Sequence, residues 1–352
     1  MAMSFAGQSP VENQTPHPDP AQLMMQMATG YVLSACLWTA AELRVADQLQ
    51  SGPRHVAQLA DVAGVTQDGL YRVLRALAMT GIFTETENRT FALTPTAELL
   101  RSDHPNSQRD FVVWLADPFH SRVVAELMHS VKTGKPAVEK VTGKPVFEFL
   151  PSDPVENVRF HNAMTNLSAA FIPALFEVYD FSQFSTVVDV AGGHGYTICE
   201  ILRRHPGVKG ILFDLDQVVP GAEHRICKLS LESRCRMVGG DFFKSVPEGG
   251  DAYVMKMIIH DWDDERALFI LRNCHRALQN QSKGKLILLE LVLPPGDQPS
   301  PSKLIDLEML LMTGGRERTA QEFRELLAKA GFRLTQIIPT RSPFCVVEAE
   351  LA

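Results

Sequence analysis

The second half of the chain alternates short apolar runs, rich in β-branched residues, with segments of helical pattern, and this alternation limits the fold more than any other feature. Strands connected through helices need crossovers, which predict a mostly parallel sheet. A last pair of strands is separated by only a few residues, too few for a crossover, so it is predicted to be antiparallel. The predicted strands are Thr186–Val190, Lys209–Phe213, Cys235–Val238, Ala252–Met257, Lys285–Leu293, Phe332–Ile338 and Phe344–Glu350. Residues 181–352 are therefore predicted to form an α/β domain of doubly wound, Rossmann-like type.

The first half of the chain has mostly helical patterns and divides into three segments. Residues 1–18 are polar and contain several prolines, which predicts a disordered tail. Residues 19–104 are predicted to form a mainly helical domain that begins with a helix from Pro20 to about Leu49. Apolar residues surround this helix, so we expect it to be buried on more than one side, against a second subunit or within its own chain. Residues 105–180 are predicted to be a helical connecting region.

Residues 53–100 have the pattern helix, turn, helix and β-ribbon, which is typical of a winged helix. One interpretation is a DNA-binding regulator with a ligand-sensing domain. This unit, however, carries four arginines against five acids: Arg54, Arg72, Arg75 and Arg89 against Asp61, Asp68, Glu85, Glu87 and Glu98. A helix in the major groove needs a basic surround to offset the phosphate charges. A structural or dimerising role is therefore favoured.

Composition excludes further classes of function. The net charge of -7 disfavours nucleic acid and anionic membrane surfaces as partners, and no apolar run approaches the length that spans a bilayer. The N-terminus shows no secretory signal pattern. The six cysteines include no Cys-x-x-Cys pair, which is typical of reduced thiols in a cytoplasmic protein. Cysteines and histidines are not clustered at ligand spacing, so no metal site is predicted.

A glycine-rich turn follows the first predicted strand, in the sequence Val187–Gly195. Ligands of open α/β sheets bind outside the carboxyl ends of the strands, so this turn is the predicted cofactor site. Ile198 stands where a dinucleotide fingerprint has its third glycine, which disfavours a nicotinamide dehydrogenase. Asp189 in the strand would repel a pyrophosphate but suits a ligand with an ammonium group.

Acids also stand at the next two strand ends. Asp214 lies about where a ribose-binding carboxylate is expected. Asp241 and Phe242 together can bind an adenine amino group and stack on its ring. The alternative is that these acids are ordinary helix N-caps.

The candidate for the chemistry is His260, at the carboxyl end of the fourth predicted strand. Histidine suits proton removal near neutral pH. Glu290 lies within an apolar strand, where a carboxylate is costly without a partner. Glu317 follows a glycine turn and precedes a helix that Thr319 is predicted to cap. Carboxylates beside an imidazole fix its tautomer and stabilise the imidazolium, so the three residues predict a general base.

Five motifs together resemble one family over about residues 20–350. They are Asp189–Gly195, Phe213–Leu215, Gly240–Phe243, His260–Trp262 and Gly314–Thr319. The sequence is similar to the class I S-adenosylmethionine-dependent O-methyltransferases related to plant caffeate and acetylserotonin O-methyltransferases and to bacterial tailoring enzymes. The resemblance implies an N-terminal dimerisation domain, a homodimer, and a C-terminal Rossmann-like domain. Ala191 departs from the pattern, because many members have a glycine there.

The resemblance also implies roles for individual residues. His260 matches the base, with Glu290 and Glu317 as its flanking acids, and Phe160 and Met164 match residues that line the substrate pocket within region 105–180. Met309 and Met312 are further candidates for a flexible apolar pocket, although methionines are more often plain core. The predicted cofactor-binding residues are Ser168, Asp189, Gly192, Gly193, Gly195, Asp214, Asp241, Phe242, Lys256 and Asp261.

The predicted reaction is methyl transfer from S-adenosylmethionine to the hydroxyl of a small, aromatic molecule, with S-adenosylhomocysteine as the product and no metal. Polyketide, phenolic acid, indole and flavonoid-like acceptors all stay open, and so does an amine acceptor. The alternative within this fold is hydroxylation or decarboxylation, which the histidine with both glutamates disfavours.

Overall fold

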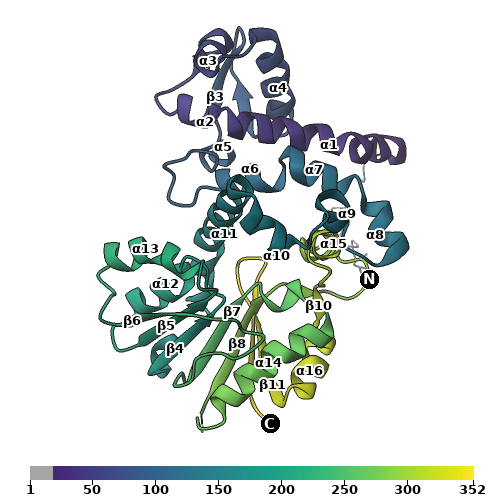
Figure 1. Cartoon of the computed structure of the whole chain (residues 1–352). Coiled ribbons are helices and arrows are strands. Elements are labelled where there is room, and N and C mark those ends of the chain that lie inside the picture. The colour runs from purple at the N-terminus through teal and green to yellow at the C-terminus, as the bar shows by residue number, and fades with distance from the viewer. Residues whose placement is uncertain (1–18, 282) are drawn as a thin grey trace, which may run out of the picture.

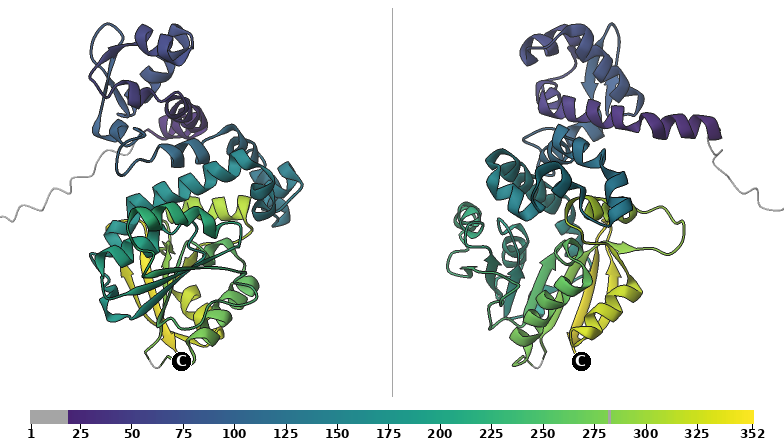
Figure 2. Two further views of the ribbon diagram at one scale, coloured as in Figure 1. Left: turned by 60° about the vertical axis from the view of Figure 1, so that its left-hand side comes forward. Right: turned by 45° about the vertical axis from the view of Figure 1, so that its right-hand side comes forward.

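A computed structural model describes residues 19–281 and 283–352 (Figure 1). The predicted disordered tail, residues 1–18, lies outside the described residues. An N-terminal helical domain is followed by a helical connecting region and then by an α/β domain (Figures 1 and 2). In the described part of the chain, no helix is both long enough and apolar enough to cross a membrane.

The α/β domain contains a seven-stranded sheet in the order β11-β12-β8-β7-β4-β5-β6. The five strands from β4 to β8 pair in parallel, whereas β12 is antiparallel to both β8 and β11. This confirms the predicted parallel sheet with an antiparallel terminal pair. The strands are β4 (Thr186–Val190), β5 (Lys209–Asp214), β6 (Cys235–Gly239), β7 (Ala252–Lys256), β8 (Lys285–Glu290), β11 (Phe332–Pro339) and β12 (Cys345–Leu351).

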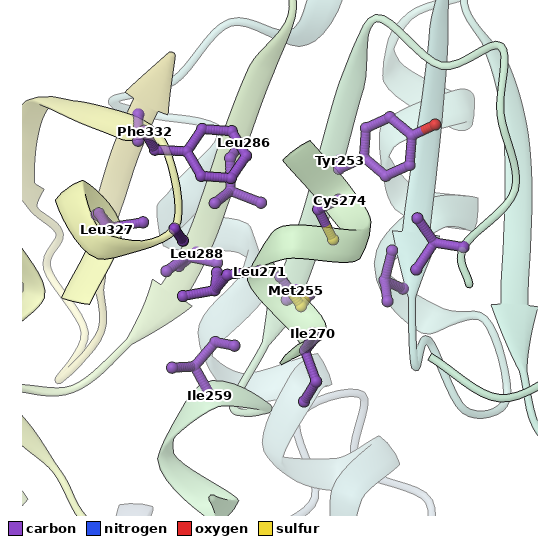
Figure 3. Packing of buried hydrophobic residues seen from close by; sticks show 14 of the residues in the cluster. Tyr253, Met255, Ile259, Ile270, Leu271, Cys274, Leu286, Leu288, Leu327 and Phe332 are labelled. Carbon is purple, nitrogen blue, oxygen red and sulfur yellow. The ribbon is translucent and has the colours of Figure 1, made fainter. Parts of the chain in front are cut away.

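Helices cover both faces of this sheet because successive strand side chains alternate between two cores. Val188 belongs to the core under two of these helices, and Val187 to the core on the opposite face. Figure 3 shows Ile259 beside Ile270 and Leu271 in the first of these cores. The covering helices are α14 (Asp264–Leu278) and α16 (Ala320–Lys329) on one face, and α12 (Tyr196–Arg204), η3 (Val219–Ala222) and α13 (Glu223–Lys228) on the other.

The predicted strand Lys285–Leu293 is in fact two strands, so that prediction was wrong in its extent. β8 ends at Glu290, and β9 (Val292–Leu293) pairs instead with β10 (Arg318–Thr319) in a separate two-stranded sheet. At the end of β8, the Glu290 side chain accepts hydrogen bonds from the backbone amides of Ile258 and Ile259. The carboxylate that interrupts the apolar run therefore marks the end of the strand.

The N-terminal domain packs helices against a small antiparallel sheet. His55 caps its helix through a capping box, whereas Thr66 occupies an N-cap position without a side-chain hydrogen bond. The predicted first helix breaks at Arg44, whose φ is +51°. The elements are α1 (Pro20–Glu42), α2 (Val45–Gln48), β1 (Arg54–His55), α3 (Val56–Ala63), α4 (Gln67–Met79), β2 (Phe83–Glu85), β3 (Thr90–Leu93) and α5 (Pro95–Glu98).

The first half of α1 is exposed in the single chain. Met24, Met25, Met27 and Tyr31 each expose 70% or more of their surface. Of the two alternatives for this helix, burial within its own chain does not hold for these residues, which leaves burial against a second subunit.

The connecting region lies over the carboxyl ends of the parallel strands (Figures 1 and 2). Helix α15 (Ser302–Met312) returns to this region from the α/β domain and packs against α7, α8 and α9. Phe147 and Trp262 also meet across the boundary, with ring centroids 5.3 Å apart. The region contains α6 (Arg109–Leu115), α7 (Pro118–Val124), α8 (Leu127–Thr133), α9 (Ala137–Thr142), α10 (Val146–Phe149), η1 (Leu150–Ser152), α11 (Pro154–Leu175) and η2 (Phe181–Gln183).

Candidate active site

The turn after β4 presents bare backbone at the carboxyl edge of the sheet. Gly193 and Gly195 have φ values of +56° and +72°, which glycine adopts without steric cost. A Cβ on Gly192 would lie 2.4 Å from a methyl carbon of Leu212, so no side chain fits there. Ala191 also has a positive φ, +56°, which costs about 1 kcal/mol for a residue with a Cβ. The turn is thus built to let a ligand approach its main chain.

Asp214 lies at the end of β5 and holds the turn from the side. Its carboxylate accepts hydrogen bonds from the backbone amides of Gly193 and Leu215, at 2.7 Å each. Burial raises the pKa of Asp214, although these two hydrogen bonds oppose the shift. A carboxylate oriented in this way is suited to accept further hydrogen bonds from ligand hydroxyls.

Asp189 lies beneath the turn rather than on its open face. It is 1% exposed, and its Oδ2 accepts a hydrogen bond from the backbone amide of Ile198 at 3.1 Å. Burial raises the pKa of Asp189 to about 7, with this hydrogen bond and the charge of Lys256 opposing the shift. Burial likewise lowers the pKa of Lys256.

Three further predicted cofactor residues, Asp241, Phe242 and Ser168, lie on or just after other elements. Asp241 follows β6, and its Oδ1 accepts a hydrogen bond from the amide of Phe243 at 2.9 Å. Phe242 is half-buried beside Trp262, with ring centroids 6.0 Å apart. Ser168 is buried in α11, where its hydroxyl donates to the Met164 carbonyl at 2.7 Å.

His260 lies in the short helix η4 (Ile259–Asp261), directly after β7, and is 3% exposed. Its Nδ1 is 2.7 Å from Glu317 Oε1, and its Nε2 is 3.7 Å from Asp261 Oδ1. Glu290 lies on the neighbouring strand β8 and holds the backbone of this segment, because its Oε1 accepts from the Ile258 and Ile259 amides. The structure therefore brings the predicted base and both predicted acids together.

Burial raises the pKa of the acids around His260. It raises the pKa of Glu290 to about 7, against the opposing charge of His260, and the pKa of Glu317 to about 8. Burial also raises the pKa of Asp261 to about 7. One ligand-capable atom from each of His260, Glu290 and Glu317 lies within 4.8 Å of the others. Such a trio has the donor set of a divalent cation site, although hydrogen bonds already engage Glu290 Oε1 and Glu317 Oε1.

Three residues that sequence reasoning missed hold the base segment in place. Arg318 is 1% exposed and donates to the carbonyls of Ile259 and Trp262, on either side of His260, at 2.9 Å each. Gly315 packs so closely that a Cβ there would lie 2.0 Å from the His260 carbonyl oxygen. Asp306 accepts a hydrogen bond from the Glu317 amide at 2.8 Å. Arg318 and Gly315 belong to the motif Gly314–Thr319, in which the turn, Glu317 and the Thr319 cap were interpreted but not these contacts with the base segment.

Two family models match the chain. An O-methyltransferase domain matches residues 124–333, more than half of the chain, and an O-methyltransferase dimerisation domain matches residues 25–103. The chain belongs to the O-methyltransferase family. The predicted resemblance is thereby confirmed, as is an S-adenosylmethionine-dependent O-methyltransferase as the class of enzyme.

The methyltransferase resembles characterised relatives over almost its full length. The phenazine O-methyltransferase PhzM from Lysobacter antibioticus is 41% identical over 329 residues, which cover 94% of this chain and 96% of the relative. The O-demethylpuromycin-O-methyltransferase from Streptomyces alboniger is 35% identical over 351 residues, with 95% and 93% covered. CalO1, a methyltransferase in calicheamicin biosynthesis solved with S-adenosylhomocysteine bound, matches with a TM-score of 0.85 at 33% identity, covering 96% of this chain and all of that chain.

The residues of the methyltransferase fit the cofactor that such relatives bind. The backbone at Gly193 faces open space, with nothing within 4 Å of where a Cβ would lie, and the Asp214 carboxylate accepts a hydrogen bond from its amide. Both features suit a nucleoside joined to an amino acid.

The predicted pocket residues of the methyltransferase divide between two apolar clusters. Phe160 and Met312 pack with Phe119 in a cluster between the connecting region and α15. Met164 packs with Met257 in a second cluster, next to the base segment. Met309 is 7% exposed, and the Thr313 hydroxyl lies 3.8 Å from its sulfur.

Proposed function

We propose that the methyltransferase methylates a hydroxyl group on a small aromatic molecule, with His260 as the general base. The observation that carries this proposal is the 2.7 Å contact between His260 Nδ1 and Glu317 Oε1. This contact fixes the proton on Nδ1, so Nε2 is left with a lone pair that can accept a proton. Glu290 orients the segment through the Ile258 and Ile259 amides, and each acid stabilises the imidazolium that forms when that acid is ionised.

The cofactor, when bound, supplies a methyl group already activated on a sulfonium. We propose that Gly192, Gly193 and Gly195 hold its methionine part by their backbone, with Lys256 and Asp261 nearby. Asp214 would bind the ribose, and Asp241 with Phe242 the adenine. Ser168 and Asp189 are buried and hydrogen-bonded to backbone, so we propose that they act by shaping the site. Positioning of the acceptor hydroxyl supplies the rest of the rate.

A relative of known structure supports an aromatic acceptor. One solved relative, NcsB1 from neocarzinostatin biosynthesis, holds S-adenosylmethionine with 2-hydroxy-5-methyl naphthoic acid, at 34% identity and a TM-score of 0.76. We propose Phe160, Met164, Met309 and Met312 as residues of the acceptor pocket.

An amine acceptor is the second candidate. One relative, from Streptomyces davaonensis, is named 8-amino-8-demethylriboflavin N,N-dimethyltransferase and is 32% identical over 338 residues. A neutral amine has less need of a base than a hydroxyl does. The His260 site therefore favours the hydroxyl.

The test is methyl transfer by the purified protein to planar phenols and to matched anilines. Calorimetry first measures binding of S-adenosylhomocysteine, and mass spectrometry then measures methylated product against S-adenosylhomocysteine formed. Equal amounts of the two products, on phenols and not on anilines, are expected. Product on anilines alone would assign the chain to amine methylation. Hydroxylated or decarboxylated product would assign it to the alternative chemistry.

We propose that the methyltransferase is a homodimer that uses α1. Met24, Met25, Met27 and Tyr31 expose a large apolar surface within the part of the chain that matches the dimerisation domain or next to it. Light scattering should give twice the mass of the chain, and Tyr31→Asp should shift the protein toward the monomer.

The six cysteines are all free thiols, which fits the predicted cytoplasmic location.

A further inference from the structure

A second group of buried charges lies in the connecting region, away from His260. His120 in α7 is 1% exposed, with Nδ1 3.3 Å from Asp117 Oδ1 and Nε2 3.3 Å from Glu308 Oε1 in α15. Arg159 in α11 links Asp117 to Glu156, at 3.6 Å and 3.0 Å. These five residues, the distal polar cluster, join α7, α11 and α15, and the last two helices also carry the candidate pocket residues.

The distal polar cluster contains atoms whose hydrogen-bonding capacity is unused. In the described part of the chain, Glu156 Oε2, Glu308 Oε1 and His120 Nε2 are buried and have no hydrogen-bond partner. His120 and Glu308 face each other as an ion pair, but not in hydrogen-bonding alignment. Buried carboxylate oxygens are normally satisfied, because leaving one unpaired costs about 1–3 kcal/mol. Oxygens of this kind accept hydrogen bonds only, so a donor must complete them.

The cluster adjoins the apolar candidate pocket. Glu156 precedes Phe160 by one helical turn on α11, and Glu308 precedes Met312 by one turn on α15, so each carboxylate lies on the face that carries a pocket residue. Trp114 contacts both sides, with its ring centroid 4.5 Å from His120 and 5.5 Å from Phe160. A cavity of about 230 Å³ opens beside Glu156, lined also by Phe119, Arg122, Val141, Thr142, Phe149 and Asp153.

We propose that the distal polar cluster binds an amino group of the acceptor, on the part of the acceptor that lies away from the hydroxyl to be methylated. The proposal rests on the proposed function for the identity of the reaction, but its argument is about binding. An N–H group would satisfy Glu156 Oε2, which borders the cavity, and a carboxylate cannot do so, whereas Glu308 Oε1 already faces His120 Nε2 at 3.3 Å. A carboxylate would also meet the three negative charges of Asp117, Glu156 and Glu308, against the positive charges of His120 and Arg159.

Arg122 also lines this cavity, and its positive charge would favour an acceptor that carries a negative group. It is exposed, and its guanidinium lies 6.0 Å from the Phe119 ring centroid. Solvent and salt screen an exposed charge much more than buried ones. The acceptor preferred by the site is therefore an amino-substituted phenol and not a carboxylated one.

Three matched bicyclic phenols test this: 5-amino-1-naphthol, 1-naphthol and 5-hydroxy-1-naphthoic acid. Calorimetry with the protein saturated by S-adenosylhomocysteine measures their binding, and initial rates with S-adenosylmethionine measure KM and kcat. We expect the amino compound to bind about tenfold to a hundredfold more tightly than 1-naphthol, and the acid to bind most weakly. Equal binding of all three would overturn the proposal and indicate that water completes these oxygens. Tightest binding of the acid would overturn it in favour of Arg122.

Variants separate the carboxylates from a general effect on the fold. Glu308→Gln and Glu156→Gln each should weaken binding of 5-amino-1-naphthol about tenfold and reduce the discrimination against the acid. Glu139→Gln, an exposed glutamate on α9, is the matched control and should keep the preference of the parent protein. Equal losses for all three phenols in both Gln variants would overturn the specific role. Preferential binding without methyl transfer would contradict the proposed function alone, whereas methyl transfer without preference would contradict this inference alone.

Discussion

The methyltransferase contains two buried histidines that each lie between carboxylates, and they differ in where the protons are held. At His120, burial opposes the charged form, but Asp117 and Glu308 outweigh it and raise the pKa of His120 to about 9. At His260, the neighbouring acids have the shifted values, with the pKa of Glu290 raised to about 7 and that of Glu317 to about 8 by burial.

His120 forms a structural imidazolium, whereas His260 is the proposed catalytic base. His120 keeps its proton throughout the neutral range, so it acts as a fixed positive charge between α7 and α15. Burial raises the pKa of Glu290 to about 7 and of Glu317 to about 8, so these two acids can exchange protons near neutral pH. Proton transfer is most efficient where such groups have pKa values near the working pH. The arrangement of a histidine between two acids therefore does not by itself indicate a base.

The largest expected effect is that of His260→Ala. Loss of a general base typically lowers kcat about 10²–10⁴-fold, and S-adenosylhomocysteine binding should be kept because the glycine turn is untouched. Initial rates by mass spectrometry and calorimetry measure the two quantities. A loss in kcat of less than about tenfold would mean that His260 is not the base and that the two histidines do not differ as described.

The next effect concerns stability and His120. Its folded pKa lies above the unfolded value of 6.5, so its contribution to stability is complete below about pH 6.5 and is lost as pH rises through 9. The free energy of unfolding of the parent protein should therefore fall over this window by up to about 3 kcal/mol more than that of His120→Gln. Urea unfolding at several pH values measures this. His224→Gln, on the exposed face of α13, should follow the parent curve; parallel curves for His120→Gln would contradict a raised pKa.

A smaller effect is expected for the acid on Nδ1 of each histidine. Glu317→Gln should lower kcat about tenfold to a hundredfold, because an amide that donates to Nδ1 moves the imidazole proton to Nε2. Asp117→Asn is the matched variant and should lower the melting temperature with a smaller change in kcat. Equal losses of kcat in Glu317→Gln and Asp117→Asn would contradict the assignment of His260 as catalytic and His120 as structural.

The smallest effect is expected from metal removal. Glu317 Oε1 is engaged by His260, and Glu290 Oε1 by two backbone amides, so we expect a metal-free base. Dialysis against EDTA should change the rate by less than about twofold. A loss that Mg²⁺ or Zn²⁺ restores would assign His260, Glu290 and Glu317 to a metal site, and the base would then have to be sought elsewhere.

The sequence predicted the α/β domain, and it predicted those site residues that stand at the ends of recognisable strands. The glycines after β4, Asp214 after β5 and His260 after β7 all stand at strand ends, where the topology of a parallel sheet brings residues together. Glu290 was found because a carboxylate in an apolar strand needs an explanation. The split of β8 from β9 after this residue was missed because strand pairing depends on Arg318 and Thr319, which are distant in sequence.

The distal polar cluster could not be predicted from the sequence. His120 lies in a helical segment without a neighbouring motif, and its partner Glu308 belongs to a helix of the other domain. A lone histidine and a lone glutamate on amphipathic helices look like solvated side chains. Only the packing of α15 against the connecting region brings their charges together. The apolar pattern of α1 left open which molecule covers it for a related reason, since such a pattern does not distinguish a second subunit from the same chain.

Gly315 has a consequence for how this enzyme can diverge. Since a side chain at position 315 would collide with the His260 carbonyl, a library randomised there should yield almost no active clones other than glycine. Glu156 lines a cavity, so a library at position 156 should yield active clones with altered acceptor preferences, at some cost in stability because Arg159 loses a partner. Substitutions are thus tolerated less around the base than at the distal polar cluster. The acceptor preference can therefore change while the transfer chemistry stays the same.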